Sequence, residues 1–366
     1  MKVLLIQFDG KFPNIALMRI SSHHKALGDT VTLKHCGNVA ALEPLFLAEF
    51  DRIYGSLIFE WNRLVAQHLL WLRPDAIIGG SGWDEIPNDG SLVKIGARRA
   101  EAVVSQVELH GVMTKEKDYS LYPTFKDSIG FTQRGCRLCC PFCKVPVIEP
   151  KMMQDQLIDG IWRGEGYPKN LIIWDNDTFG APEWRDTFKA IIDGGYRVSF
   201  NQGINARLMN EENAEVFAAT PCYSDDFKTR RWYTAWDKRS DEDILFRGLR
   251  YMVKYGIKPD QIMVYMLIGY WPGETSADRD YTRRKLREFG VRPYPMPFRR
   301  PAHQRGCRCA ECESRRELVG FQRWVIGAYD KWLPWDEWKN ADCRPENLNV
   351  TERRPALHSQ IEEVKS

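Results

Sequence analysis

Short apolar runs alternate with amphipathic stretches along the first third of the chain. The runs that predict strands are residues 3–6, 30–33, 53–59 and 75–80. The stretches between them with apolar side chains at helical spacing are residues 17–27, which stop at Gly28, and residues 64–72. Because strands that alternate with helices favour a parallel sheet, we predict an α/β domain of Rossmann or flavodoxin type over residues 1–115.

The alternation of strands and helices resumes after a polar stretch, residues 114–120, which reads as a linker. The next predicted strands are residues 128–132, 171–175, 197–201, 232–235, 262–268 and 291–296, with helical stretches between them, for example 241–255 and 276–289. Six such units over residues 116–297 predict a partial parallel barrel, (β/α)6, rather than an eight-fold one. Chemistry in these folds lies at the carboxyl ends of the strands.

The pattern changes after residue 297. Residues 298–343 hold several cysteines and a predicted helix over residues 315–332, and the polar residues 344–366 read as a disordered tail. Hydrophobic residues make up 43% and charged residues 28% of the chain, which is the composition of a globular protein. A net charge of +3 gives no electrostatic argument for or against nucleic acid.

The chain lacks the sequence features of membrane insertion or export. No apolar stretch approaches 18 residues, so we expect no membrane-spanning helix. The first apolar run is short and stops at Asp9, which favours a buried strand over a secretory signal. We therefore expect a cytoplasmic protein.

Seven of the ten cysteines fall in two clusters. Clustered cysteines in a long chain with no export signal favour metal ligands over a disulfide framework. The first cluster contains Cys136, Cys140 and Cys143 in the spacing C-x3-C-x2-C, with Cys139 beside them. Thiolates are the soft ligands that iron–sulfur clusters require, and three of them leave the fourth iron of a four-iron cluster open. Zinc is the alternative, although the adjacent Cys139 and Cys140 make an awkward tetrahedral pair.

The first cluster resembles the motif of the radical S-adenosylmethionine (radical SAM) superfamily. The resemblance rests on the spacing, on Phe142 before the last cysteine, and on the position after the first predicted barrel strand. The preceding Thr-Gln-Arg-Gly of residues 132–135 and the trailing Pro146 are similar to the subgroup with an N-terminal cobalamin-binding-type domain. The resemblance implies that Cys136, Cys140 and Cys143 hold a 4Fe–4S cluster whose open iron binds SAM.

The same resemblance implies positions for SAM along the barrel. Phe142 would lie near the adenine. Asp175, Asn176 and Asp177 resemble the end of the second strand, where oxygens bind the amino group, although this chain lacks the Gly-Gly-Glu of many members. Turn or helix-capping roles are the alternative for these three residues.

Three further positions resemble later strands of the family. Gln202 would contact the ribose, and Arg207 would pair with the SAM carboxylate, unless it is a surface arginine of the next helix. Gly269, in the region that resembles the fifth strand, would let the backbone approach the adenine. The catalytic residue beyond the cluster stays unknown.

The N-terminal region resembles a cobalamin-binding-type domain but lacks the D-x-H-x-x-G motif that commonly supplies a histidine ligand. His23 and His24 lie in a predicted helix without the preceding aspartate, and His24 falls on the apolar stripe. Some members bind cobalamin without this histidine, but we favour a degenerate domain without cobalamin.

The second cluster is Cys307, Cys309 and Cys312 in the spacing C-x-C-x2-C, which Cys343 could complete. An auxiliary iron–sulfur cluster, a structural zinc site and free thiols are the three hypotheses.

We therefore expect a radical SAM enzyme that forms a 5′-deoxyadenosyl radical and acts on an unidentified small molecule or RNA. The family implies an external electron donor of flavodoxin or ferredoxin type. One alternative is a methyl or methylthio transferase acting on RNA or a small metabolite. The other is a non-catalytic zinc protein that binds nucleic acid through its basic, Trp-rich C-terminal segment.

Overall fold

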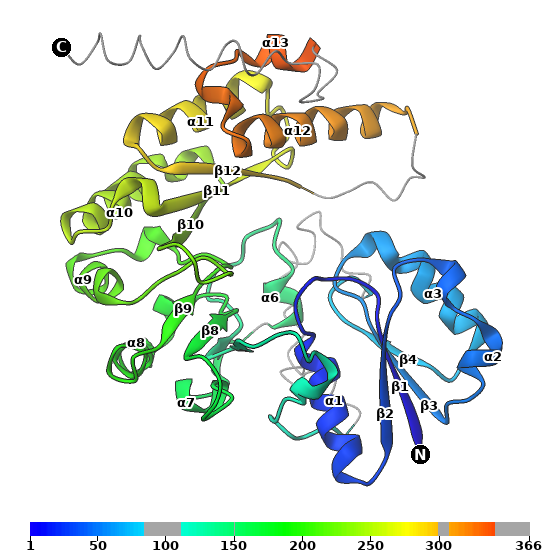
Figure 1. Cartoon of the computed structure of the whole chain (residues 1–366). Coiled ribbons are helices and arrows are strands. Elements are labelled where there is room, and N and C mark those ends of the chain that lie inside the picture. Colours follow the sequence, from blue (N-terminus) through cyan, green and yellow to red (C-terminus); the bar gives the residue numbers. More distant parts are fainter. Residues whose placement is uncertain (84–110, 150, 299–306, 341–366) are drawn as a thin grey trace. The chain divides into compact units, whose positions relative to one another are not determined.

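The computed structural model describes residues 1–83, 111–149, 151–298 and 307–340 (Figure 1). The chain divides into two compact units. Unit 1 contains residues 1–204 and 219–230, and unit 2 contains residues 205–218 and the described residues from 231 onward. Each unit is a mixture of helices and mainly parallel strands, so the predicted α/β class is confirmed.

The first sheet of unit 1 has four parallel strands in the order β2–β1–β3–β4. Its strands are β1 (Lys2–Gln7), β2 (Thr30–His35), β3 (Arg52–Ser56) and β4 (Ile77–Gly79). The helices that connect them are α1 (Ile15–Ala26), α2 (Pro44–Leu47) and α3 (Arg63–Leu72). The chain adds β2 on one side of β1 and then β3 and β4 on the other, so the order switches between β1 and β3.

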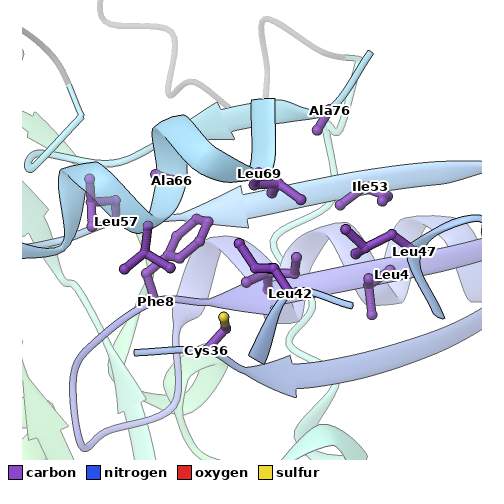
Figure 2. Packing of buried hydrophobic residues seen from close by; sticks show 12 residues of the cluster. Leu4, Phe8, Cys36, Leu42, Leu47, Ile53, Leu57, Ala66, Leu69 and Ala76 are labelled. Atoms are coloured by element: carbon purple, nitrogen blue, oxygen red, sulfur yellow. The ribbon is translucent and has the colours of Figure 1, made fainter. Parts of the chain in front are cut away.

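Side chains of β1 alternate between two apolar layers. Leu4 and Ile6 join the cluster formed with α2 and α3, part of which Figure 2 shows. Val3 and Leu5 join a second cluster that contains Leu17 of α1. Because successive side chains of a strand point to opposite faces, an uninterrupted apolar run is what a sheet covered on both faces requires.

The second sheet of unit 1 contains three parallel strands in the order β5–β8–β9. They are β5 (Ser128–Gly130), β8 (Asn170–Ile173) and β9 (Arg197–Ser199). A short antiparallel pair, β6 (Gln133–Arg134) and β7 (Met153–Gln154), follows β5. The helices of this region are α6 (Val145–Ile148), α7 (Ile158–Ile161) and α8 (Trp184–Asp193).

The polar segment that reads as a linker lies against α1. Arg19 Nε donates to the backbone oxygen of Thr114 at 2.6 Å. Asp118 accepts a hydrogen bond from the hydroxyl of Ser21 at 2.6 Å and pairs with Lys25 at 2.7 Å. These contacts give the polar residues of the segment specific partners on the N-terminal domain.

Unit 2 contains a three-stranded parallel sheet in the order β10–β11–β12. Its strands are β10 (Trp232–Trp236), β11 (Ile262–Ile268) and β12 (Arg292–Pro297). Its helices are α10 (Glu242–Lys254), α11 (Ser276–Phe289), α12 (Ala310–Ile326) and α13 (Trp335–Asn340), together with most of α9 (Glu211–Ala219).

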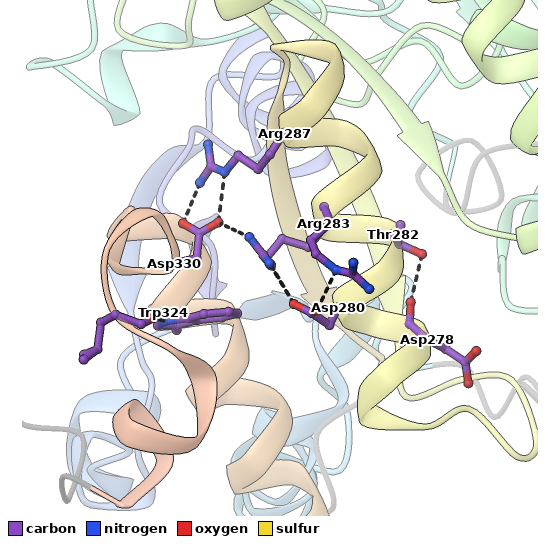
Figure 3. A network of polar contacts seen from close by, with 9 residues as sticks. Asp278, Asp280, Thr282, Arg283, Arg287, Trp324 and Asp330 are labelled. Carbon is purple, nitrogen blue, oxygen red and sulfur yellow. Dashed lines mark hydrogen bonds and ion pairs between the residues drawn. The ribbon is translucent and has the colours of Figure 1, made fainter. Parts of the chain in front are cut away.

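An arginine–aspartate network fastens the end of α12 to α11 (Figure 3). The carboxylate of Asp330 is fully buried and accepts hydrogen bonds from Arg287 Nε and Nη2 at 2.9 Å and from Arg283 Nη1 at 3.1 Å. The guanidinium of Arg283 also lies over the ring of Trp324. A buried carboxylate paired with two arginines is fully compensated, and loss of either partner would leave an uncompensated charge.

The predicted strands all have counterparts in the structure, mostly with shifted ends. No helix in the described ranges is both long and apolar enough to cross a membrane. The predicted domain boundaries at 115/116 and 297/298 stay predictions. The predicted tail at 344–366 lies outside the described residues.

Candidate cysteine-loop site

The loop that carries the first cysteine cluster starts three residues after β5 and is closed at its base. Gln133 and Arg134 of β6 pair with Gln154 and Met153 of β7. Beyond this ladder, the backbone N–H of Asp155 donates to the oxygen of Thr132 at 2.8 Å. The intervening residues therefore project from the carboxyl end of β5 as a tied loop.

Three of the four thiols in this loop are half-buried. They belong to Cys136, Cys140 and Cys143, whereas Cys139 is exposed. The N–H of Cys143 donates to the oxygen of Cys140 at 3.0 Å, and the N–H of Leu138 donates to Cys136 Sγ at 3.3 Å. Burial, with smaller contributions from Asp177, Cys143 and Cys140, raises the pKa of Cys136 to about 12. A cation that binds this thiolate would supply the missing charge compensation.

The spacing of these sulfurs differs from that of a single-ion site. Among the described residues, the one group of three ligands whose atoms all lie within 4.8 Å of one another is Cys307, Cys309 and Cys312. At least one pair of the sulfurs of Cys136, Cys140 and Cys143 therefore lies more than 4.8 Å apart. Three thiolates are a donor set that iron–sulfur clusters use.

Asp175 holds the start of the cysteine loop. Its Oδ1 accepts hydrogen bonds from the backbone N–H groups of Thr132 at 2.7 Å and Gln133 at 3.1 Å. Its Oδ2 accepts from the hydroxyls of Thr132 and Thr178. Both carboxylate oxygens of Asp175 thus accept hydrogen bonds, from Thr132 and Gln133 at the start of the loop and from Thr178. Complete burial raises the pKa of Asp175 to about 6, although these hydrogen bonds lower it.

The raised pKa of Asp175 predicts a pH-dependent contribution to stability. Because the pKa near 6 in the folded protein exceeds the ordinary aspartate value of 3.8, the folded state takes up a proton first, and stability rises as pH falls through 6. Between pH 7 and pH 5 the wild-type protein should gain about 1 kcal/mol relative to Asp175→Asn. Chemical unfolding of both proteins at the two pH values measures this gain, and parallel pH profiles would contradict it.

Glu149 clamps the opposite side of the loop and was missed from the sequence. Its carboxylate accepts from the N–H of Gly135 at 2.9 Å and from Asn176 Nδ2 at 2.9 Å, and it pairs with Arg134. Asn176, expected at the SAM amino group, therefore binds the loop through Glu149. No spacing in the sequence identifies Glu149, because its partners lie on both sides of the cysteines.

Asp177 lies beside the first cysteine. Its carboxylate is buried, and Arg137 Nε lies 3.0 Å from its Oδ2. Burial raises the pKa of Asp177, and the charge of Arg137 partly offsets this. The structure thus brings Asp177 and Cys136 together from separate predicted motifs. Arg137, inside the motif, received no role from the sequence.

Lys144 connects the cysteine loop to the N-terminal sheet of unit 1. Its ammonium group lies 2.6 Å from Glu60 Oε1 and 2.8 Å from the backbone oxygen of Ser81. Both partners follow the carboxyl ends of strands β3 and β4. Lys144, which directly follows Cys143, is therefore held by residues that do not belong to the cysteine loop.

The other predicted SAM contacts in unit 1 are less enclosed. Phe142 is half-buried, and Gln202 is exposed in the turn that follows β9. That turn is closed by a 2.9 Å hydrogen bond from the N–H of Gly203 to the oxygen of Phe200. Gln202 thus follows the carboxyl end of its strand, as predicted from the sequence.

Arg207 and Gly269 belong to unit 2. Arg207 Nη1 pairs with Asp241 at 2.9 Å, and its Nε donates to Asn205 Oδ1 at 2.9 Å. Burial raises the pKa of nearby Asp237 to about 6, and the charge of Arg207 lowers it. Gly269 follows β11 in the left-handed region, and its N–H donates to Glu274 Oε2 at 3.0 Å.

The second cysteine cluster precedes and begins α12. Desolvation and the neighbouring sulfurs of Cys309 and Cys307 raise the pKa of Cys312 to about 12. Cys343, the predicted fourth ligand, lies outside the described residues.

A cavity of about 720 Å³ lies in unit 1, apart from all predicted site residues. Its lining includes Lys115, Lys117, Tyr119, Lys126 and Arg163. Burial lowers the pKa of Lys117 to about 8. No function was predicted for these residues.

His24 is buried and engaged on both ring nitrogens. Its Nδ1 lies 2.7 Å from Asp29 Oδ2, and its Nε2 lies 3.0 Å from the hydroxyl of Tyr54. These contacts agree with a packed histidine on the apolar stripe of α1.

Comparison with known proteins finds no family model, no curated protein and no solved structure that matches this chain.

Proposed function

We propose that this protein is a radical SAM enzyme whose cluster ligands are Cys136, Cys140 and Cys143. The observation that carries the proposal is the cysteine loop: three half-buried thiols in the spacing C-x3-C-x2-C, on a loop that is closed at its base and follows a parallel strand. The exposed Cys139 is left outside the ligand set. Three thiolates leave one iron of a 4Fe–4S cluster without a protein ligand, and SAM would bind this iron.

When bound, the cluster and SAM together supply a reductive cleavage that yields methionine and a 5′-deoxyadenosyl radical. The residues of the chain position that chemistry. Asp175 and Glu149 fix the two sides of the loop, and Lys144 anchors its far end. The buried carboxylate of Asp177, beside Cys136 and Arg137, is the acceptor that we propose for the ammonium group of SAM.

The proposed architecture is a partial (β/α)6 barrel after an N-terminal domain. Its support is the consecutive order of two parallel three-stranded sheets, β5–β8–β9 and β10–β11–β12. The order β2–β1–β3–β4 supports a flavodoxin-like N-terminal domain. In this domain Gln7 Nε2 donates to the backbone oxygens of Asp9 and Phe12, and Asp9 accepts from the N–H of Ile58. The proposed domain is a degenerate one without cobalamin, because the sequence lacks the D-x-H-x-x-G motif.

The proposed reaction is hydrogen abstraction from an unidentified small molecule or RNA, with electrons from a flavodoxin- or ferredoxin-type donor. Anaerobic reconstitution with iron and sulfide, followed by dithionite and SAM, tests it. We expect about four irons per chain at this site, formation of 5′-deoxyadenosine, and a change in the electron paramagnetic resonance spectrum of the reduced cluster when SAM is added. A fully loaded cluster that shows neither product nor spectral change would overturn the proposal.

A further inference from the structure

Three cysteines converge at the beginning of α12. Cys309 is the N-cap residue of this 17-residue helix, Cys312 lies in its first turn, and Cys307 precedes it. Their Sγ atoms all lie within 4.8 Å of one another. Residues three apart on a helix share one face, so the backbone itself brings Cys309 and Cys312 together. The convergence is therefore a property of the local fold.

The distances between these sulfurs distinguish two kinds of metal site. Zinc binds thiolates at about 2.3 Å in a tetrahedron, which places neighbouring sulfurs about 3.8 Å apart. A four-iron cluster gives each cysteine its own iron and so holds the sulfurs at separate corners. The sulfurs of Cys307, Cys309 and Cys312 lie within 4.8 Å of one another, which is the closeness that ligands of one shared ion need.

The surroundings of the three thiols carry charges of both signs. The positive end of the α12 dipole points at Cys309 and Cys312, and Arg316 Nη1 donates to the backbone oxygen of Cys307 at 2.7 Å. Glu311 and Glu313 lie in the same first turn, and Arg316 pairs with Glu313 at 3.6 Å. A bound divalent cation would therefore supply most of the charge compensation for three thiolates.

The helix that carries the cysteines is rigidly placed within unit 2. Arg315 Nη1 donates to the oxygen of Phe298 at 3.2 Å, and Gln322 Nε2 donates to the oxygen of Pro295 at 2.8 Å. The side chain of Leu318 fills the space where a Cβ on Gly269 would lie. Arg315 and Leu318, which follow the cysteines along α12, thus contact residues just after β12 and β11. The network around Asp330 fixes the opposite end of the helix (Figure 3).

We propose that Cys307, Cys309 and Cys312 bind a single zinc ion through their thiolates, with the fourth position of the tetrahedron taken by a further ligand. Binding releases the thiol protons to solvent and requires no redox step. The ion joins the segment that precedes α12 to the first turn of that helix. This inference stands apart from the proposed function, because it rests on different residues.

Metal analysis of the full-length protein tests the proposal. Zinc, iron and sulfide are measured per chain in the wild type, in C136A/C140A/C143A, in C307S/C309S/C312S, and in Cys139→Ser as a control with one exposed thiol removed. We expect one zinc in every protein except C307S/C309S/C312S. No zinc in the wild type after growth with added zinc, zinc retained in C307S/C309S/C312S, or iron and sulfide retained in C136A/C140A/C143A would each overturn it.

A second measurement on folded protein covers the case in which the triple variant fails to fold. Cobalt(II) exchanged into C136A/C140A/C143A should give the strong thiolate-to-cobalt absorption of a tetrahedral site. Removing the metal with a chelator should add three to the number of titratable thiols. Weak octahedral absorption, or an unchanged thiol number, would overturn the proposal. Neither readout uses SAM, so this inference and the proposed function can fail separately.

Discussion

Replacing Cys140 with alanine will abolish the formation of 5′-deoxyadenosine from SAM. The variant loses one of three thiolates that hold the proposed cluster, and two cannot replace the third. Changes outside the ligand shell alone cost about 10–100-fold in metal affinity or activity, so loss of a ligand should exceed about a hundredfold. The measurement is product formed per chain after anaerobic reconstitution, together with bound iron.

Cys139→Ala is the matched control for this variant. Cys139 is adjacent in sequence but exposed, so its replacement should leave both product and iron at wild-type levels. Wild-type amounts of 5′-deoxyadenosine from Cys140→Ala would show that the cysteine loop does not take part in the cleavage of SAM. Equal loss in both variants would show that the loop tolerates no change, and Cys140 would then have no special role.

Replacing Gly135 with alanine will open the cysteine loop and destabilise unit 1. Gly135 has a φ of +75°, and a Cβ at this position would overlap the backbone oxygen of Lys151. The left-handed conformation costs an alanine about 1–2 kcal/mol, and the overlap with rigid backbone should bring the total to at least about 3 kcal/mol. Chemical unfolding measures the loss of stability, and iron uptake reports the loop.

Gly164→Ala separates these two costs. Gly164 also has a positive φ, +92°, but nothing lies within 4 Å of a Cβ there. This variant should lose only about 1–2 kcal/mol and bind iron normally. If both variants lost the same stability and both retained iron, the close approach of Lys151 to Gly135 would have no role in closing the loop.

The strands were predictable because burial on both faces leaves a local trace. In β1 the apolar run of residues 3–6 could be recognised from the sequence without knowledge of the strands that pair with it. The strand ends were less predictable. The predicted strand at 128–132 stops at Gly130, and the N–H of Thr132 donates instead to Asp175, which follows the neighbouring strand β8. This partner lies 43 residues away, and no local pattern records it.

The helix at the second cysteine cluster shows a similar limit. The sequence predicted residues 315–332, whereas α12 spans Ala310–Ile326. It begins earlier because Cys309 takes the N-cap position. It ends earlier because the chain turns at Gly327 and at Ala328, whose φ is +58°. Apolar periodicity alone identifies neither position.

The candidate site likewise has a local part that could be predicted from the sequence and a long-range part that could not. The spacing of Cys136, Cys140 and Cys143 is local and could be read directly. The clamp formed by Glu149 and the pairing of Arg137 with Asp177 depend on how distant segments meet. Long-range partners of this kind are what a single sequence conceals, because any carboxylate on the chain could fill the role.

One hydrophobic core of unit 1 joins residues that the ribosome synthesises far apart in time. Met18 of α1 shares a buried cluster with Ile129, Ile172 and Phe227. The cluster around Met18 is therefore complete only after roughly 200 further residues have been synthesised. At about 5–20 residues per second that interval is roughly 10–40 s. During this interval the apolar side chain of Met18 lacks part of its packing partners.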